Sequence, residues 1–462
     1  MKYVIFLFLS FLYTAVGQNS PSNELTYNEF LGYVKKYHPL VKTANLNVTQ
    51  AQANLMMARG GFDPKIDVDF SQKVYDDKEY YSLFNSSFKI PTWYGIEVKA
   101  GFENNDGAYL NPENKVPNQG LTALGISIPL AQGLLINQRM ADIRKAKIQI
   151  KLSDADRKMQ AIAVLYDASV AYFNWKRYFE EAQMYLEYKA NAQKRFEGIQ
   201  SLIKEGDKPA IDSTEAGIIV KNRLLSYEDS QLKQVKAGIE LSNFLWTENN
   251  IPLELTETVI PEEKLELTIQ ETLKTNELVN QDFNLMNHPK IKALESKIEI
   301  LNVEKKLKAN MLLPKIDVGY AYLSEPNYFN NYDFNDYKLG MNFNFPLFLR
   351  KERGNLKMVK YKIQETEFAL SLEKIQLSNK INAQKTEIES LLKQKELTNG
   401  LVKDNSLMLN SEERLFSFGE SSLFLINSRE NNLVSAKLAA IAIKNRYFIS
   451  ISELFKIMAN PD

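Results

Sequence analysis

The chain of 462 residues contains no cysteine and only two histidines. The missing thiols exclude disulfide bonds, cysteine-ligated zinc, thiol nucleophiles and acylation of a lipoprotein cysteine. The sequence also lacks a glycine-rich phosphate loop after a strand, and it contains neither an HExxH nor a GxSxG motif. These absences argue against an enzyme, against a bound cofactor or metal and against a lipid-anchored protein.

An excess of charge and long apolar segments are missing as well. Lysine plus arginine equals aspartate plus glutamate at 57 each, which argues against a nucleic-acid partner. No segment approaches the roughly 20 consecutive apolar residues that a transmembrane helix needs. Near its start the sequence has a basic residue, Lys2, then an apolar run over residues 4–13 and the small residues Ala15-Val16-Gly17. This layout predicts a cleaved signal peptide over residues 1–17 and an exported protein that is not lipidated.

The two histidines mark an internal repeat. His38-Pro39 is followed after 26 residues by Pro64, and His288-Pro289 is followed after the same interval by Pro314. Each later proline opens the phrase Pro-Lys-Ile-Asp-Val. Because each histidine precedes a proline at an expected helix start, we interpret both histidines as helix-entry residues rather than as a pair of metal ligands.

The offset of 250 residues between the two phrases predicts a duplicated unit. We expect the first repeat at residues 24–250 and the second at residues 271–460. Residues 251–270 would form a linker or equatorial segment between them. Each repeat should follow the same path, which begins with a helix.

Glycine and proline are scarce, at 19 and 15 residues, and they separate long segments that contain neither. Residues 134–197 form one such segment, with apolar side chains at helical spacing, for example Met159 and Ile162. A helix from about residue 133 to residue 204 would be roughly 105 Å long. It should turn back near Gly206, giving a helical hairpin at 133–247. The second copy predicts an equivalent hairpin at 350–458 that turns near Gly419.

Ahead of each hairpin the periodicity changes from helical to alternating. In the second copy, large apolar side chains at positions 316, 318, 320 and 322 alternate with Asp, Gly and Ala. Each second strand ends at a Pro-Leu pair, which begins at Pro129 or at Pro346. Strands of about 9 to 11 residues suit a tilted transmembrane strand. The predicted strand pairs are 65–75 with 121–130, and 315–324 with 336–346.

The first copy is longer than the second between equivalent prolines, with 65 residues against 32. The 33 additional residues lie within segment 76–120, which contains an alternating run at 96–102 and the turn-rich stretch Asn104-Asn105-Asp106-Gly107. We expect this insertion to form an elaborated loop or an extra hairpin at the outer end of the sheet. Four strands alone would have open edges, so a sheet covered by lipid must close with copies of itself.

In this order and in duplicate, the helix, strand pair and helical hairpin resemble the outer-membrane efflux protein family, the TolC-like channels. The resemblance covers essentially the whole mature chain. It implies a mixed α/β membrane protein, mostly α, in which the duplicated unit gives four strands per subunit. The twelve strands of a homotrimer would form one outer-membrane β-barrel, continued by a long periplasmic α-helical barrel.

The resemblance also implies a function. The protein would be the trimeric exit channel of a tripartite efflux pump or type I secretion system in the outer membrane of a Gram-negative-type cell. Such a passive duct contacts outer-membrane lipid and docks to a periplasmic adaptor and an inner-membrane transporter. The alternative is a periplasmic coiled-coil adaptor or structural protein. An adaptor normally has one hairpin within a β domain, whereas this chain has two hairpins preceded by strands, which favours the channel.

In this family the entrance constriction lies at the helix tips. The first-copy tip, residues 206–216, would then contribute Asp212 and Glu215, which lie one helical turn apart, and rings of both carboxylates would favour cations. The equivalent positions in the second copy are Phe424 and Asn427, so the acidic pair has no counterpart there and Phe424 would form an apolar constriction. Alternatively, Asp212 and Glu215 serve as a helix cap and dipole partner, and Phe424 packs between helices.

Overall fold

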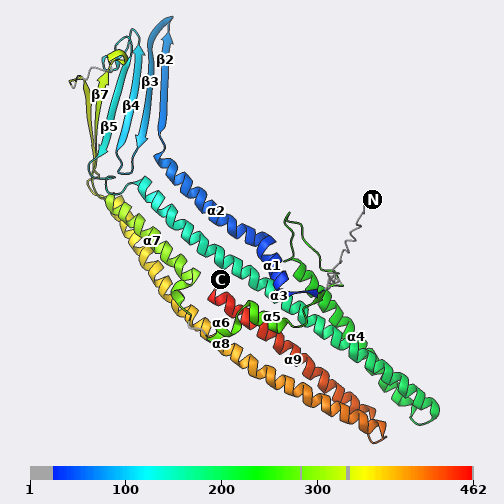
Figure 1. Ribbon diagram of the computed structural model, residues 1–462. Coiled ribbons are helices and arrows are strands. Elements are labelled where there is room, and N and C mark those ends of the chain that lie inside the picture. The colour runs from blue at the N-terminus through cyan, green and yellow to red at the C-terminus, as the bar shows by residue number, and fades with distance from the viewer. Residues whose placement is uncertain (1–23, 257, 281–282, 329–332, 334, 460–462) are drawn as a thin grey trace, which may run out of the picture. The chain divides into compact units, whose positions relative to one another are not determined.

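A computed structural model describes residues 24–256, 258–280, 283–328, 333 and 335–459 (Figure 1). The predicted signal peptide lies outside the described residues. Contacts divide the chain into two compact units. Among the described residues, the tip unit comprises 24–38, 165–280 and 387–452, and the sheet unit comprises 39–164, 283–386 and 453–459. Each unit takes segments from both predicted repeats, so the repeats are not two separate bodies.

The described residues of the sheet unit form six antiparallel strands in the order β2-β3-β4-β5-β7-β8 (Figure 1). β2 pairs only with β3 and β8 pairs only with β7 within the described chain, so these two strands form the edges of the sheet. The strands are β2 (Lys65–Tyr75), β3 (Lys78–Pro91), β4 (Glu97–Asp106), β5 (Leu121–Pro129), β7 (Lys315–Ser324) and β8 (Tyr337–Asn344). Pro64 and Pro314 directly precede β2 and β7, Pro129 ends β5, and Pro346 follows β8.

The expectation of four strands per chain is wrong for the described residues. The insertion 76–120 supplies β3 and β4, which lie within the sheet between β2 and β5 rather than at its outer end. β3 pairs with β2 from Lys65 opposite Lys89 to Tyr75 opposite Lys78. Asp76 and Asp77 link these strands with φ of 53° and 51°, the left-handed conformation of a two-residue hairpin turn. The two predicted strands of the first copy are therefore not direct neighbours.

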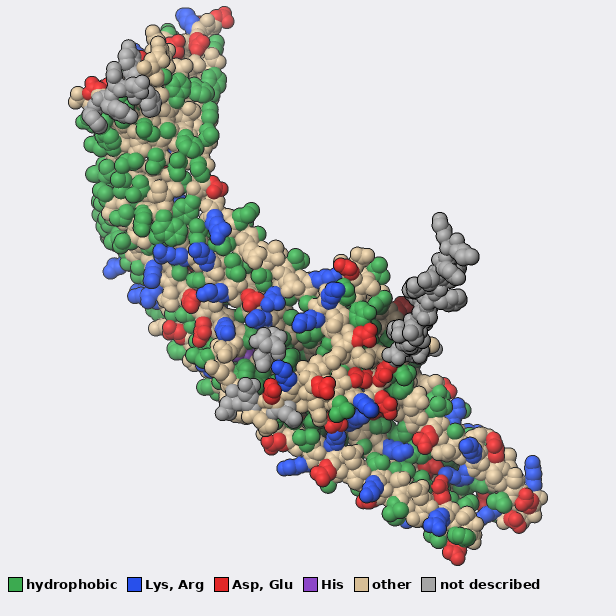
Figure 2. All heavy atoms as spheres, viewed as in Figure 1, with side chains coloured by type: hydrophobic (Ala, Val, Ile, Leu, Met, Phe, Trp, Pro, Cys, Tyr) green, Lys and Arg blue, Asp and Glu red, His purple; other side chains and the backbone are tan. Residues whose placement is uncertain are grey.

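The register places large apolar side chains on one face of all six strands. One cross-strand row runs from Ile66 through Phe88, Ala100, Leu124 and Tyr322 to Tyr337. Many members of this face are exposed in the single chain, for example Ile66 at 74% and Met341 at 71%. Figure 2 shows hydrophobic side chains gathered over the sheet. We call this surface the apolar face.

The opposite face of the sheet carries small and polar residues where β5, β7 and β8 lie side by side. Gly125 lies opposite Ala321, and Gly319 lies opposite Gly340. A Cβ atom added to Gly125 would lie 2.4 Å from the carbonyl oxygen of Tyr320. This close approach requires glycine and holds β5 and β7 together across the junction of the two predicted repeats.

Four helices join one end of this sheet. α2 (Pro39–Arg59) leads into β2, and β5 leads into α3 (Gln138–Glu205). α7 (Pro289–Asn310) leads into β7, and β8 leads into α8 (Arg350–Ser417). Within the sheet unit α7 packs on both long helices. Its buried Leu307 packs with Ala141 of α3 and with Ile136, which precedes α3, and its Leu301 packs with Val359 and Ile363 of α8.

The tip unit is built on the later parts of α3 and α8. Each of these helices has 68 residues, which corresponds to about 100 Å. The other helices of this unit are α1 (Tyr27–Tyr37), α4 (Ala210–Ser242), α5 (Leu265–Thr272), α6 (Thr275–Asn280) and most of α9 (Leu423–Met458). None of the described helices combines the length and the apolar character that crossing a membrane requires.

An aromatic cluster fixes α1 on α3. The ring of Tyr27 lies 5.4 Å from that of Tyr172 and 5.3 Å from that of Phe173. The Tyr27 hydroxyl is 2.7 Å from Ser169 Oγ, and burial raises the pKa of Tyr27 to about 12. Nearby, β1 (Glu24–Leu25) pairs in parallel with β6 (Ile260–Pro261). The predicted linker 251–270 therefore contains β6 and the start of α5.

Candidate functional site

The two helical hairpins of the tip unit turn with the same backbone geometry. Gly206 follows α3 with φ of +83°, and Gly419 follows α8 with φ of +78°. Gly206 N–H donates to Ile203 O, and Asp207 N–H donates to Leu202 O. The second hairpin repeats this pattern between Gly419, Glu420 and the end of α8. Both ends are Schellman-type caps, in which a left-handed residue, here glycine, satisfies the last helix carbonyls.

Apolar packing joins the two hairpins just below these turns. Ile199 of α3, Ala216 of α4 and Leu423 of α9 form one buried cluster, and Phe416 of α8 packs against it. All four helices therefore share one core at the tip. The two turns are held beside each other without a covalent link.

The four predicted tip residues occupy different environments. Asp212 and Glu215 are half-buried in the first two turns of α4. Asn427 is buried, and its Nδ2 donates to Glu215 Oε1 at 3.4 Å. Phe424 is 69% exposed at the second residue of α9. The structure thus brings together Glu215 and Asn427, the equivalent positions of the two predicted repeats, but this contact does not include Asp212 or Phe424.

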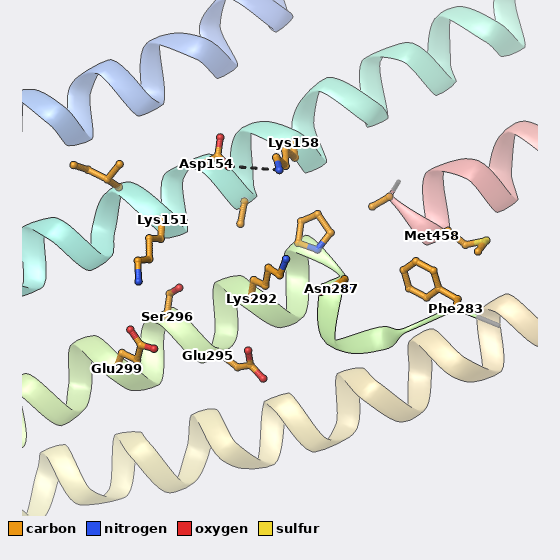
Figure 3. A pocket seen from close by; sticks show the side chains of 14 residues that line it. Lys151, Asp154, Lys158, Phe283, Asn287, Lys292, Glu295, Ser296, Glu299 and Met458 are labelled. Carbon is orange, nitrogen blue, oxygen red and sulfur yellow. Dashed lines mark ion pairs between the residues drawn. The ribbon is translucent and has the colours of Figure 1, made fainter. Parts of the chain in front are cut away.

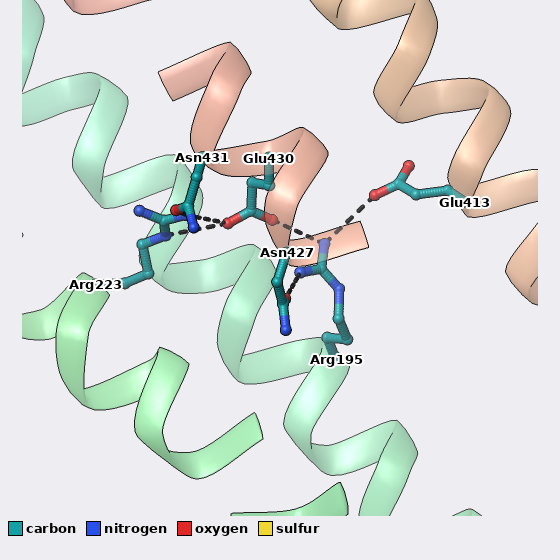
Figure 4. Close-up of polar contacts among 6 residues, drawn as sticks. All are labelled: Arg195, Arg223, Glu413, Asn427, Glu430 and Asn431. Carbon is teal, nitrogen blue, oxygen red and sulfur yellow. Dashed lines mark hydrogen bonds and ion pairs between the residues drawn. The ribbon is translucent and has the colours of Figure 1, made fainter. Parts of the chain in front are cut away.

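A buried ion cluster beside this pair connects the hairpins (Figure 4). The Glu430 side chain is only 2% exposed, and its two oxygens contact different arginines. Glu430 Oε2 lies 2.8 Å from Arg195 of α3, and Glu430 Oε1 lies 2.9 Å from Arg223 of α4. We call Arg195, Arg223 and Glu430 the tip triad.

Further polar side chains contact the two arginines of the tip triad. Arg223 donates to Asn431 Oδ1 at 2.7 Å, and Arg195 donates to Asn427 Oδ1 at 3.4 Å. Arg195 also lies 3.4 Å from Glu413 of α8. Because a charge taken out of water is costly unless it is paired, these contacts make the helix arrangement depend on all three triad residues. The triad ties α9 to both helices of the other hairpin.

The sequence does not reveal this triad directly, because its arginines lie more than 200 positions before Glu430. One signal was present. Residues 427–432 read Asn-Ser-Arg-Glu-Asn-Asn, and six consecutive polar residues cover every side of a helix. At least one of them must therefore face the helical core. The partners could not be identified without the tertiary structure.

The two histidines act at helix ends. His38 is the C-cap of α1 and stacks on Phe244 at 5.6 Å between ring centres. His288 is the N-cap of α7, where its Nδ1 accepts from Lys290 N and its Nε2 lies 3.0 Å from Ile457 O. Burial lowers the pKa of both histidines. Across the described ranges, no group of three or more histidine, aspartate or glutamate side chains could hold a metal ion.

The sheet unit contains a cleft of about 690 Å³ between α3 and α7 (Figure 3). Lysines line it together with carboxylates: Lys158 pairs with Asp154 at 3.7 Å, and Lys292 lies on the same helix as Glu295. Phe283 and Met458 close one side. The mixed charges do not select a ligand of one sign, so we regard the tips as the better candidate site.

Comparison with known proteins identifies relatives of this architecture. The model of the family described as outer membrane efflux protein matches residues 33–245. None of the curated proteins matches the chain. Several solved outer-membrane channels share its fold at low sequence identity.

Three of these structures illustrate the similarity. The Campylobacter jejuni CmeC channel has a TM-score of 0.64 at 16% identity, over 94% of this chain and 85% of that one. The open-state Neisseria gonorrhoeae MtrE channel has a TM-score of 0.66 at 13% identity, over 93% and 88%. Vibrio cholerae VceC has a TM-score of 0.63 at 12% identity, over 94% and 95%. The resemblance to the outer membrane efflux protein family is thus confirmed, by the family model over residues 33–245 and by the fold of these outer-membrane channels.

Proposed function

We propose that this protein is the subunit of a homotrimeric outer-membrane exit channel. In this role it is a passive duct of an efflux pump or type I secretion system, and it docks to a periplasmic adaptor and an inner-membrane transporter. The apolar face carries the proposal: one side of a six-stranded sheet is covered by exposed apolar side chains, and water is a poor solvent for such a surface. Export would use the predicted signal peptide, without lipidation.

The edge strands support closure of the sheet by copies of the same chain. β2 and β8 run in opposite directions because every neighbouring pair between them is antiparallel. β8 of one subunit can therefore pair with β2 of the next, which satisfies the open edges that hydrocarbon does not tolerate. With six strands per subunit, a trimer closes with eighteen strands instead of the twelve that the resemblance implied.

The tips form the gate of the proposed duct. The tip triad and the contact between Glu215 and Asn427 hold the two hairpins together in the resting state. Docking of the adaptor would move the hairpins apart in an iris-like opening. Asp212 and Glu215 would then line the entrance and favour cations, and Phe424 would form its apolar part.

Localisation tests the proposed channel against the alternative of a periplasmic adaptor. The channel predicts a detergent-extracted, heat-resistant trimer in the outer-membrane fraction, because closure of a sheet in lipid requires several copies. Membrane fractionation followed by electrophoresis with and without heating measures this. A soluble monomer in the periplasmic fraction would contradict the channel.

Bilayer recordings test the gate separately. We expect Asp212→Ala combined with Glu215→Ala to lower the cation preference and change the single-channel conductance, because two carboxylates per subunit leave the entrance. A matched control is Asp404→Ala with Glu396→Ala, which removes two exposed carboxylates of α8 away from the tip. If the tip variant behaves like the control, the gate assignment is wrong.

A further inference from the structure

We propose that the helix ends beside the sheet bind anionic phospholipid headgroups of the leaflet on the helical side. This inference rests on the proposed function, because it requires the apolar face to lie in a bilayer. It adds a lipid-binding site with a definite charge preference. The site consists of basic residues on α3, α7 and α8, and we call it the basic belt.

The basic belt is a local excess of positive charge in a chain without net charge. Residues 139–147, 304–308 and 350–360 contain twelve lysines and arginines against three carboxylates. The three segments are the start of α3, the end of α7 and the start of α8, which all join the same end of the sheet. Figure 2 shows Lys and Arg side chains directly beside the apolar side chains of the sheet.

The densest part of the basic belt lies on α8. Its five basic residues are exposed in the single chain, and they follow one another within three turns of helix. They are Arg350, Lys351, Arg353, Lys357 and Lys360. Each side chain has a long apolar stem and a charged end, so it can reach a headgroup while its stem remains beside the acyl chains.

An apolar anchor precedes these charges. Leu347 and Phe348, in the turn between β8 and α8, are 85% and 72% exposed. The guanidinium of Arg350 lies 5.1 Å from the centre of the Phe348 ring. Exposed apolar residues followed at once by cations are typical of a segment at the boundary of a membrane, where acyl chains contact the first group and phosphates the second.

Two observations favour lipid over a second copy of the chain at this surface. All three segments of the belt are basic, so the belts of neighbouring subunits would lie at the same level as like charges and would not neutralise one another. The belt is also continuous along the chain with the apolar face, since β8 leads through Leu347 and Phe348 into α8. An anionic headgroup supplies the phosphate oxygens that lysine and arginine bind.

Spin-labelled lipids test the proposal on the full-length protein in phosphatidylcholine vesicles. The wild type should bind phosphatidylglycerol more tightly than phosphatidylcholine, and about 1 M salt should weaken this preference. The combined variant Arg350→Gln, Lys351→Gln and Arg353→Gln should reduce the preference about fivefold, because three headgroup contacts are lost. The measured quantity is the ratio of the association constants of the two labelled lipids.

A matched control removes three exposed lysines from helices of the tip unit: Lys236→Gln, Lys393→Gln and Lys403→Gln. This control should keep the wild-type preference. Equal binding of both lipids by the wild type, or an unchanged preference in the belt variant, would overturn the proposal. Failure of the wild type to insert into vesicles would instead contradict the proposed channel, so the two failures are distinguishable.

Discussion

At the scale of single residues, Glu430 is a buried carboxylate that depends on its partners for neutralisation. Its carboxylate is buried between two arginines that come from different helices of the other hairpin. The carboxylate of Glu413 also contacts Arg195, but its side chain is 48% exposed. The two glutamates therefore form a natural comparison between a buried and an exposed ion pair on one arginine.

Replacement of Glu430 by glutamine should loosen the tips. We expect Glu430→Gln to destabilise the local structure by about 3 kcal/mol, because two arginines lose their buried counter-charge. Hydrogen exchange of backbone amides in α4 and α9 near the tip measures the effect as faster exchange. Glu413→Gln is the control and should cost less than about 1 kcal/mol. Equal exchange in both variants would show that the tip triad does not hold the hairpins.

His288 should make the stability of the sheet unit depend on pH. Burial lowers its folded-state pKa below the ordinary value of 6.5. Well above pH 6.5 the His288 ring is neutral in both the folded and the unfolded chain, so it contributes no pH dependence to stability. As the pH falls below 6.5, the unfolded chain binds the proton more readily, so the free energy of unfolding decreases until the folded-state pKa is passed.

The variant His288→Asn isolates this contribution, since asparagine keeps a side-chain acceptor for Lys290 N at the start of α7. The apparent Tm of the wild type should fall between pH 7.5 and pH 5.5 by more than that of the variant. Thermal scans at one heating rate measure the difference. An identical decrease in both proteins would show that His288 is not the titrating group.

At the scale of elements, sequence patterns suffice for β2 and β7 but not for the inserted hairpin of β3 and β4. The bounds of β2 and β7 agree with the predicted ranges because a proline precedes each strand and the alternation after it is regular. In β3 the alternation is weak: Tyr81 and Leu83 lie on the polar face, and Ser86 lies on the apolar face. A strand whose two faces are mixed in this way cannot be distinguished from a loop by periodicity alone.

Removal of the hairpin should leave a smaller sheet that still closes. Without residues 78–106, β2 and β5 would become antiparallel neighbours joined by the outer loop. Because barrel diameter grows roughly linearly with strand number, the barrel of the proposed trimer should become about one third narrower. End-on class averages from electron microscopy measure this diameter.

A deletion confined to residues 109–118, in the loop between β4 and β5, is the control for this experiment. It keeps all six strands and should leave the barrel diameter unchanged. If the hairpin deletion also leaves the diameter unchanged, β3 and β4 do not belong to the wall of the barrel.

At the scale of the whole molecule, a duplicated unit could be predicted because the two His-Pro phrases can be compared along the sequence alone. The offset between the two His-Pro phrases and the glycine at each tip followed from the sequence alone. The tip triad and the order of the strands depend on contacts between distant segments, which a single sequence does not encode locally. The tip could therefore be located from the sequence, but the charges that hold it could not.

The opposite directions of β2 and β8 limit how many strands a subunit of the proposed ring can have. A ring of identical subunits closes only if the last strand of each copy can meet the first strand of the next in the same antiparallel sense. A single added strand would make the two edge strands of a subunit parallel, so they could not pair in the antiparallel sense with those of its neighbours. An added hairpin contributes two strands and keeps the edge strands antiparallel. In the proposed channel, changes of barrel width during evolution, or by design, should therefore occur in steps of two strands per subunit.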